Sequence, residues 1–429
     1  MFMKRRMINI NGYEQAHCRN HASIHIGAIT MALIAPLTHG TNITDTDNSV
    51  SASINRQNHL GVAGRINLGS FYTPAKYVDM VAEWLRSYSI DNSWTIADLS
   101  CGYGAFFELG DIPEFSRCRF IGNDIDAEAV ATAKKMFPHA ELMVENALAD
   151  VSRRKFHISE NEHIVIVGNP PYNDVTSQIN QKIKTSDIMI DADIKTRDLG
   201  MSSLLAYDKL KADYVAVLHP LSYLIKKANF KAAGRFFGNY ELLEHVVFSS
   251  QEFAGTSKHT GFPVIVALYR RKEGHGLTYD NVQNIRFRTV EGNTFVLSGF
   301  DYATDYVKKY PHKERYKPEI LFYTMRDINA LKRCRTFIKD RIANAIDVSP
   351  DQLPYYCYID CFKRYADVPY WMGNFDVPFM ADEFPTIAEA AVADAKYHNP
   401  EVFGQQPAPN PEDRTRIKAY ISKTLRQEK

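Results

Sequence analysis

The sequence predicts an α/β protein built on a mainly parallel β-sheet that helices cover on both faces. Short apolar segments alternate with amphipathic or alanine-rich segments between residues 69 and 271. Strands that are apolar on both faces are typical of parallel sheets, because helices bury each side. Motifs rich in glycine, asparagine and proline follow several of these segments. Ligands of such sheets bind beyond the carboxyl ends of the strands, so this placement favours an enzyme.

The individual elements follow from periodicity and from residues that start or stop helices. Thr73 is a suitable N-cap and Pro74 a suitable first residue of an amphipathic helix. Further helices are expected over 126–137, 202–211 and 230–237. Strands are expected over 95–99, 119–123, 141–144, 164–167, 214–218, 242–248 and 264–269.

Length and composition set the domain organisation that we expect. We expect a partly disordered arm or linker over 1–65, the α/β domain over 66–275 and a second domain over 276–429. An apolar run over 26–37 follows a basic N-terminus, but a polar stretch separates the two and the run is too short to span a bilayer. We therefore expect no membrane association. The net charge of +1 provides no global field for a polyanion, although local basic patches remain possible.

The cysteines and the other potential ligands do not suggest a metal. None of the six cysteines forms a CxxC pair, so neither a zinc site nor a disulfide framework is expected. Unpaired cysteines in a chain of this length fit the reducing cytoplasm.

A glycine-rich loop and an acidic residue predict a nucleoside-binding site. Two glycines let the backbone of the loop turn sharply and approach a ligand, and Asp124 ends the next strand, where a carboxylate accepts hydrogen bonds from a ribose. A dinucleotide would require a third glycine, which this loop lacks. Asn146, after the third strand, offers an amide to an adenine edge. The candidate residues are Asp98, Ser100, Cys101, Gly102, Gly104, Asp124, Ile125 and Asn146.

The most specific motif is an apolar strand that runs into Asn169, Pro170, Pro171 and Tyr172. The Asn169 side-chain oxygen and the Pro170 carbonyl would accept hydrogen bonds from an exocyclic amino group. Localising its lone pair in this way would activate the nitrogen as a nucleophile and stabilise the charge that develops on it. The prolines fix the backbone, and Tyr172 provides a face on which a base stacks.

Taken together, these motifs resemble the N6-adenine DNA methyltransferases of restriction–modification systems over roughly residues 69 to 271. The resemblance implies a Rossmann-like sheet, S-adenosylmethionine as cofactor and a flipped-out adenine as acceptor. It also implies that Tyr72, Thr73 and Pro74 lie on the cofactor side and that Phe253 stacks on the base opposite Tyr172. Phe262 is an alternative for that stacking role, and a core phenylalanine at 253 is another reading. The family usually has an aspartate where this chain has Asn146.

The short gap between Asn146 and Asn169 leaves no room there for a target-recognition domain. Such a domain would have to follow residue 271, which is the arrangement of the gamma subclass. Basic and aromatic residues are interleaved from Lys308 to Arg341, a pattern that suits contacts with double-stranded DNA. We see no nuclease signal beyond a weak one at Asp360, so a cognate restriction endonuclease would be encoded separately. RNA adenine, a protein glutamine amide, and a catalytically silent binding protein remain alternatives.

Overall fold

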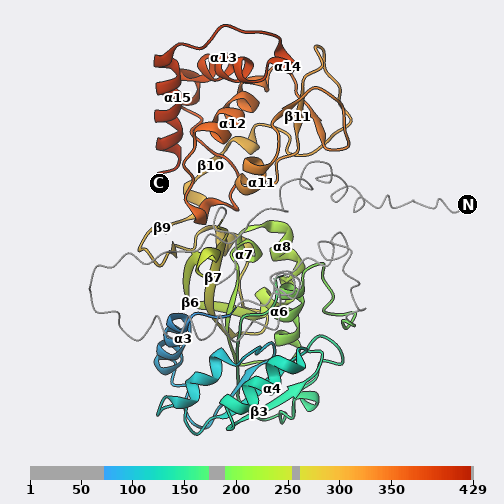
Figure 1. Ribbon diagram of the computed structural model, residues 1–429, viewed down its shortest axis with the longest axis vertical. Helices are drawn as coiled ribbons and strands as arrows, with labels where there is room; N and C mark the ends of the chain where they lie inside the picture. Colours follow the sequence, from blue (N-terminus) through green and yellow to red (C-terminus); the bar gives the residue numbers. More distant parts are fainter. Residues whose placement is uncertain (1–71, 173–188, 254–260, 427–429) are drawn as a thin grey trace, which may run out of the picture. The chain divides into compact units, whose positions relative to one another are not determined.

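The computed structural model describes residues 72–172, 189–253 and 261–426 (Figure 1), which divide into two compact units. The C-terminal unit comprises Asp301–Asp367 and Asp376–Arg426. The sheet unit comprises the described residues up to Phe300 together with Val368–Phe375. The boundary at Phe300 lies beyond the expected 275, because the segment after the sheet pairs back onto it through Val247 and Thr289. The expected arm at 1–65 lies outside the described residues.

The described part of the sheet unit contains a seven-stranded sheet in the order β3-β2-β1-β4-β5-β7-β6. Neighbouring strands from β3 to β5 are parallel, whereas β7 is antiparallel to both β5 and β6. The fold is therefore α/β with a mainly parallel sheet, as the sequence predicts. The strands are β1 (Thr95–Asp98), β2 (Arg119–Asp124), β3 (Ala140–Val144), β4 (Ile164–Gly168), β5 (Tyr214–Pro220), β6 (Tyr240–Ser249) and β7 (Pro263–Arg271).

Helices cover both faces of this sheet. Successive strand residues point to opposite sides, and every residue of β4 is buried, so both faces are covered there. Val165 and Val167 of β4 join one buried cluster with residues of α3 (Ala75–Ser87), the 3-10 helix η2 (Ala105–Asp111) and α4 (Ala127–Met136). On the other face, Tyr269 of β7 packs against Phe236 of α9 with ring centroids 5.2 Å apart, and α9 contacts α6. The helices of this second group include α6 (Leu199–Lys209), α7 (Ser222–Ile225), α8 (Lys227–Ala232) and α9 (Gly234–Asn239).

Three helix predictions require correction. Helix α3 begins at Ala75 with Pro74 as its N-cap and no side-chain cap, because Thr73 is buried against the cavity described below. Helix α6 begins earlier than expected, since the Asp198 carboxylate caps it by accepting from Met201 N at 3.1 Å. The expected single helix over 230–237 is two helices that meet at Ala233, next to Gly234, a residue that weakens helix interiors.

A second group of elements follows the sheet. In the sheet unit these are α10 (Tyr279–Gln283) and the hairpin of β8 (Phe287–Arg288) and β9 (Thr294–Phe295). The C-terminal unit contains β10 (Asp301–Tyr302), β11 (Leu321–Tyr323), α11 (Ile328–Arg333), β12 (Phe337–Ile338), β13 (Ala345–Asp347), α12 (Leu353–Tyr365), β14 (Pro378–Phe379), α13 (Ala388–His398), α14 (Pro400–Phe403) and α15 (Pro411–Thr424).

Buried ionic contacts hold the helices of the C-terminal unit together. Asp394 is fully buried and accepts from Arg364 Nη2 at 2.8 Å and from the Tyr365 hydroxyl at 2.8 Å. Asp360 is 2% exposed and accepts from Arg364 and from Asn399 Nδ2. A carboxylate engaged in this way is part of the core, so Asp360 offers no separate active site. Within the three described ranges, no helix is long and apolar enough to cross a membrane, and no group of three or more acidic, histidine or cysteine side chains has a metal-binding arrangement.

Candidate active site

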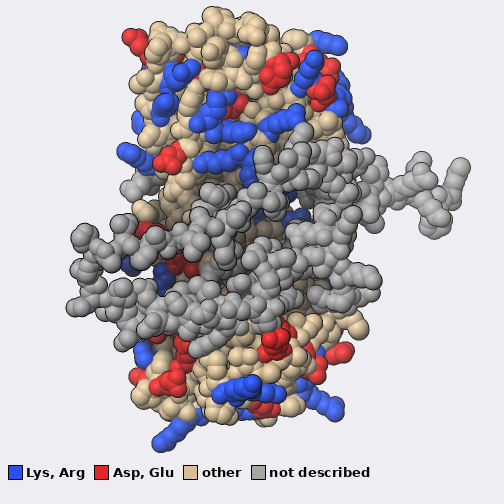
Figure 2. Space-filling view, viewed as in Figure 1, with Lys and Arg blue, Asp and Glu red and all other residues tan. Residues whose placement is uncertain are grey.

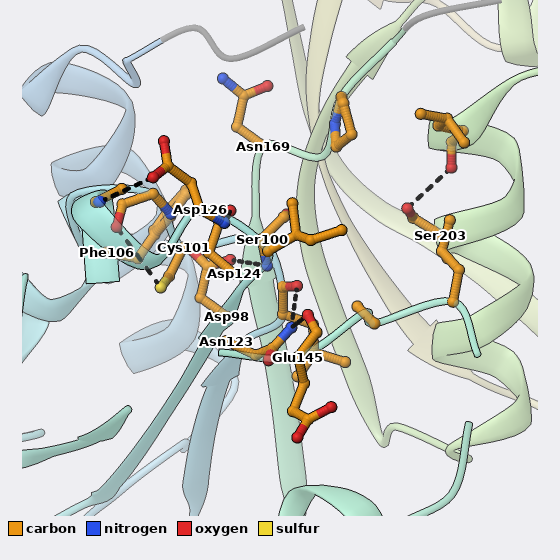
Figure 3. A pocket seen from close by; sticks show the side chains of 18 of the residues that line it. Asp98, Ser100, Cys101, Phe106, Asn123, Asp124, Asp126, Glu145, Asn169 and Ser203 are labelled. Carbon is orange, nitrogen blue, oxygen red and sulfur yellow. Dashed lines mark hydrogen bonds between the residues drawn. The ribbon is translucent and has the colours of Figure 1, made fainter. Parts of the chain in front are cut away.

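The candidate site lies where the strand order reverses. From β1 the chain proceeds outward through β2 and β3, and then returns to β4 on the other side of β1. Sheets of this kind form a crevice at the carboxyl ends of the two strands that flank the reversal. Asp98 ends β1, and Asn169 follows directly after β4. The two most informative sequence motifs therefore meet at one point of the sheet edge (Figure 3).

The loop after β1 turns through two glycines in the left-handed region, at φ 50° for Gly102 and 85° for Gly104. At Gly104 a Cβ atom would lie 2.6 Å from the Phe107 ring, so the turn also packs tightly against η2. Asp98 accepts from Ser100 N at 3.0 Å and is only 2% exposed. Burial raises the pKa of the Asp98 carboxyl to about 8. A cationic group in the crevice would favour the ionised form of this carboxyl.

The carboxylate of Asp124 is oriented by two backbone amides. Its Oδ2 accepts from Gly102 N at 2.8 Å, and its Oδ1 accepts from Asp126 N at 2.9 Å. Asn123, which is fully buried, donates from Nδ2 to the Leu99 carbonyl at 3.2 Å and to the Glu145 carbonyl at 3.1 Å. It thereby ties together the ends of β1, β2 and β3. Burial raises the pKa of Asp124, yet the two N–H donors favour its ionised form.

These groups line one cavity with an empty volume of about 1280 Å³, part of which is open solvent. Figure 3 shows Asp98, Ser100, Cys101, Asn123 and Asp124 grouped at the strand ends. Most of the predicted cofactor residues line the cavity, namely Tyr72, Thr73, Asp98, Ser100, Cys101, Gly102, Asp124, Ile125 and Asn146. Pro74 and Gly104 are not among its lining residues, since one caps α3 and the other forms the turn behind the loop.

Ile125 and Asn146, which both line this cavity, differ in what they can offer a ligand. The side chain of Ile125 is 55% exposed, so it presents an apolar surface to the cavity. The amide of Asn146 is already engaged, because its Nδ2 donates to the Met189 carbonyl at 2.7 Å and its Oδ1 accepts from Leu148 N at 3.0 Å. Only the second N–H and the second lone pair of that amide remain for a ligand.

The motif after β4 borders this cavity through Asn169 and Pro171, while Pro170 is buried. The Tyr172 hydroxyl donates a hydrogen bond to Asn169 Oδ1, which holds the two side chains together. Burial, and then the neighbouring Tyr207 and Asp198, raise the pKa of Tyr172, so its hydroxyl stays protonated. Helix α6 packs so closely against the motif that a Cβ atom on Gly200 would lie 3.2 Å from the Pro171 carbonyl oxygen.

Tyr172 faces a second cavity, which has an empty volume of about 660 Å³. Phe262 lines this cavity together with Tyr172, whereas Phe253 does not. Phe253 is 2% exposed and packs edge-on against Phe248 with centroids 5.5 Å apart. The structure thus places Phe253 in the core and Phe262 on the cavity wall.

Several site residues were not anticipated from the sequence. Helix α6 contributes Leu199, Ser203, Ala206 and Tyr207 to the first cavity. Ser203 and Tyr207 are one helical turn apart, a spacing that places both on one helix face. That pattern identifies a shared face but does not reveal which cavity the face meets. Asn374, far along the chain, lines the second cavity and carried no sequence signal.

Comparison with known proteins gives distant structural matches of low sequence identity. The sequence matches no protein-family model and no curated protein. A modification subunit of a putative type I restriction enzyme from Vibrio vulnificus is 17% identical with a TM-score of 0.39, covering 58% of this chain and 54% of that chain. A putative RNA methyltransferase from Pyrococcus horikoshii is 13% identical with a TM-score of 0.32, covering 48% of this chain and 89% of that chain.

A third structure, magnesium protoporphyrin IX methyltransferase from Synechocystis with bound S-adenosylmethionine, is 14% identical with a TM-score of 0.30. That match covers 53% of this chain and 95% of the other. The chain spans about half the length of the Vibrio subunit.

Proposed function

We propose that this protein transfers a methyl group from S-adenosylmethionine to an exocyclic amino nitrogen, namely N6 of a flipped-out adenine in DNA. One observation carries the proposal: Asn169 to Tyr172 separates two cavities at the switch point of the sheet. Asn169 and Pro171 line the first cavity, and Tyr172 lines the second. A donor in the first cavity and an acceptor in the second would meet at Asn169.

The first cavity suits S-adenosylmethionine by its chemistry. Asp124 presents an oriented carboxylate to the hydroxyls of a ribose, and exposed Ile125 offers an apolar surface to an adenine ring. Buried Asp98, whose carboxylate accepts a hydrogen bond within the described residues from Ser100 N alone, suits the methionine ammonium group. When bound, the cofactor supplies a methyl group on a sulfonium, which is a strong electrophile. The residues present therefore fit the group.

The motif after β4 activates the acceptor. An exocyclic amino nitrogen is a poor nucleophile, because its lone pair is delocalised into the ring. Asn169 Oδ1 and the Pro170 carbonyl accept its two hydrogens, which moves the nitrogen toward tetrahedral geometry and stabilises its developing positive charge. The Tyr172–Asn169 hydrogen bond holds the acceptor oxygen in place before the substrate arrives. We assign the opposite wall of the base pocket to Phe262 instead of Phe253, since Phe262 lines the cavity.

The choice of DNA as the polymer rests on the C-terminal unit, to which we assign target recognition. Figure 2 shows lysine and arginine side chains gathered on its visible face. Some basic side chains of the unit are neutralised within it: Lys309 Nζ lies 2.5 Å from Asp376 Oδ1, and Arg341 Nη1 lies 2.7 Å from Asp347 Oδ2. Lys332 and Arg333 of α11 are exposed and form no ion pair within the described ranges, so they remain available for phosphates.

The test offers one labelled cofactor to three acceptors. Purified full-length protein is incubated with tritiated S-adenosylmethionine and, in separate reactions, with plasmid DNA free of adenine methylation, with total RNA and with a protein extract. We expect label in DNA and background counts in the other two. Label confined to RNA would identify an RNA methyltransferase, and label confined to protein would favour a glutamine-amide acceptor. Absence of cofactor binding by calorimetry would contradict the proposed chemistry altogether.

A further inference from the structure

A segment of the C-terminal sequence returns to the candidate acceptor pocket. Residues Val368–Phe375 belong to the sheet unit, although the chain on both sides of them belongs to the C-terminal unit. We call this segment the return loop. It carries Asn374 to the wall of the second cavity. The full lining of that cavity within the described residues is Tyr172, Arg197, Asp198, Met201, Pro220, Ser222, Tyr223, Asn229, Phe262 and Asn374.

Aromatic contacts fix the return loop on the sheet unit. Trp371 stacks on Phe295 with centroids 4.6 Å apart and an interplanar angle of 9°. Phe375 packs edge-on against the same ring at 5.5 Å and is 3% exposed. The Tyr370 hydroxyl donates to Glu291 Oε2 at 2.9 Å. Asn374 lies between two anchored aromatic residues, so its position is set before any ligand binds.

The amide of Asn374 differs from the other polar groups on this wall. Asn229 Nδ2 donates to the Ser222 carbonyl at 3.2 Å, and Asp198 Oδ1 accepts from Tyr223 and from Met201 N. These groups are used to hold the pocket together. Asn374 is half-buried, and its side chain has no hydrogen-bond partner within the described residues. The side-chain atoms of Asn374 are not among the buried polar atoms that lack a partner, so solvent reaches the amide and it is available to hydrogen-bond a ligand in the cavity.

We propose that Asn374 is a specificity residue that hydrogen-bonds the edge of the acceptor base held between Tyr172 and Phe262. This inference rests on the proposed function. Asn169 and Pro170 take both N6 hydrogens, so the partner left to Asn374 is a ring nitrogen beside N6, which accepts from one of the two N–H donors of the amide. A glutamine amide at the end of a flexible side chain has no flat second edge to be recognised in this way. The return loop would thus link the C-terminal sequence to the choice of acceptor.

The test compares Asn374→Ala with wild type on DNA in which adenine is replaced by 7-deazaadenine or 1-deazaadenine. Each analogue lacks one ring nitrogen, so it removes one possible partner of the amide. We expect wild type to disfavour one analogue about tenfold in kcat/KM, because that analogue lacks the ring nitrogen to which the Asn374 amide donates. Asn374→Ala should fall about tenfold on normal DNA and should not distinguish that analogue from adenine. Its affinity for S-adenosylmethionine should stay within twofold of wild type.

Two controls separate recognition from folding. Asn374→Asp keeps the shape of the side chain but replaces the donor, so it should lose the same discrimination at an unchanged melting temperature. Asn284→Ala alters an exposed asparagine of the same unit outside both cavities and should behave as wild type. Equal analogue discrimination by wild type and Asn374→Ala would overturn the inference. If wild type labels RNA or protein and leaves DNA unlabelled, the proposed substrate is wrong. In that case kcat/KM of Asn374→Ala is measured on the acceptor that was labelled. A value within twofold of wild type would overturn the inference about Asn374.

Discussion

Substituting Asp124 by asparagine should weaken cofactor binding by an amount that the geometry sets. Both carboxylate oxygens accept a backbone N–H, at 2.8 Å from Gly102 and 2.9 Å from Asp126. An amide at this position keeps one oxygen and turns an NH₂ group toward the other N–H donor. The variant therefore has one oxygen fewer to accept from the ribose hydroxyls, and the loss of one such hydrogen bond to a charged group is worth about 1.5–3 kcal/mol. At about 1.4 kcal/mol per factor of ten, the Kd should rise roughly 10- to 150-fold.

Isothermal titration calorimetry with S-adenosylmethionine measures this change, and Asp213→Asn is a matched control. Asp213 also accepts a backbone N–H, from Ile164 at 2.9 Å, but it precedes β5 at the opposite end of the strands. Its substitution should leave the Kd unchanged. At saturating cofactor, kcat of Asp124→Asn should stay close to wild type, because Asp124 lies away from the transfer point. A Kd within threefold of wild type would refute our assignment of the ribose site.

Two further predictions concern Asp98 and the two phenylalanines. Burial raises the pKa of Asp98 to about 8 from an ordinary value of about 3.9, so its contribution to stability is complete below about pH 4 and is lost as the pH rises to about 8. Urea unfolding without cofactor measures this loss as a decline in the free energy of unfolding from about pH 5 to about pH 8. The decline should be smaller for Asp98→Asn than for wild type, and equal declines would contradict the assigned pKa. Phe262→Ala should lower kcat/KM for the acceptor roughly 5- to 150-fold, because stacking on a base is worth about 1–3 kcal/mol. Phe253→Ala should instead cost about 3–5 kcal/mol of stability in thermal or urea unfolding, and the reverse pattern would restore Phe253 to the base pocket.

Much of the sheet unit could be predicted from local sequence. Apolar runs such as 164–167 and the turn glycines of the loop after Asp98 depend on neighbours in the chain, so the observed β4 and the observed loop lie where expected. The edge of the sheet at which the motifs meet also followed, since parallel strands end at one edge. The sequence pattern placed Asp98 and Asn169 each at the end of a strand. That the two residues are neighbours depends on the strand order, in which β1 lies beside β4.

The parts that escaped prediction depend on contacts between distant segments. Phe253 and Phe262 have the same side chain and both lie between β6 and β7. Only the three-dimensional structure distinguishes them: Phe253 is buried in the core, and Phe262 lines the same cavity as Tyr172. Likewise, nothing near Asn374 in the sequence indicates that Val368–Phe375 leaves the C-terminal unit and packs on the sheet unit. Its anchoring residue Trp371 stacks on a ring of the β9 strand, a contact that no local periodicity encodes.

The central claim is that the motif after β4 directs a methyl group to an exocyclic amino nitrogen. Mass spectrometry of nucleosides, from unmethylated DNA incubated with the protein and S-adenosylmethionine bearing a deuterated methyl group, tests it directly. We expect deuterated N6-methyldeoxyadenosine with wild type and none with Asn169→Ala, whose affinity for the cofactor should match wild type. A label on a ring carbon such as C5 of cytosine, or an undiminished yield with Asn169→Ala, would contradict the account.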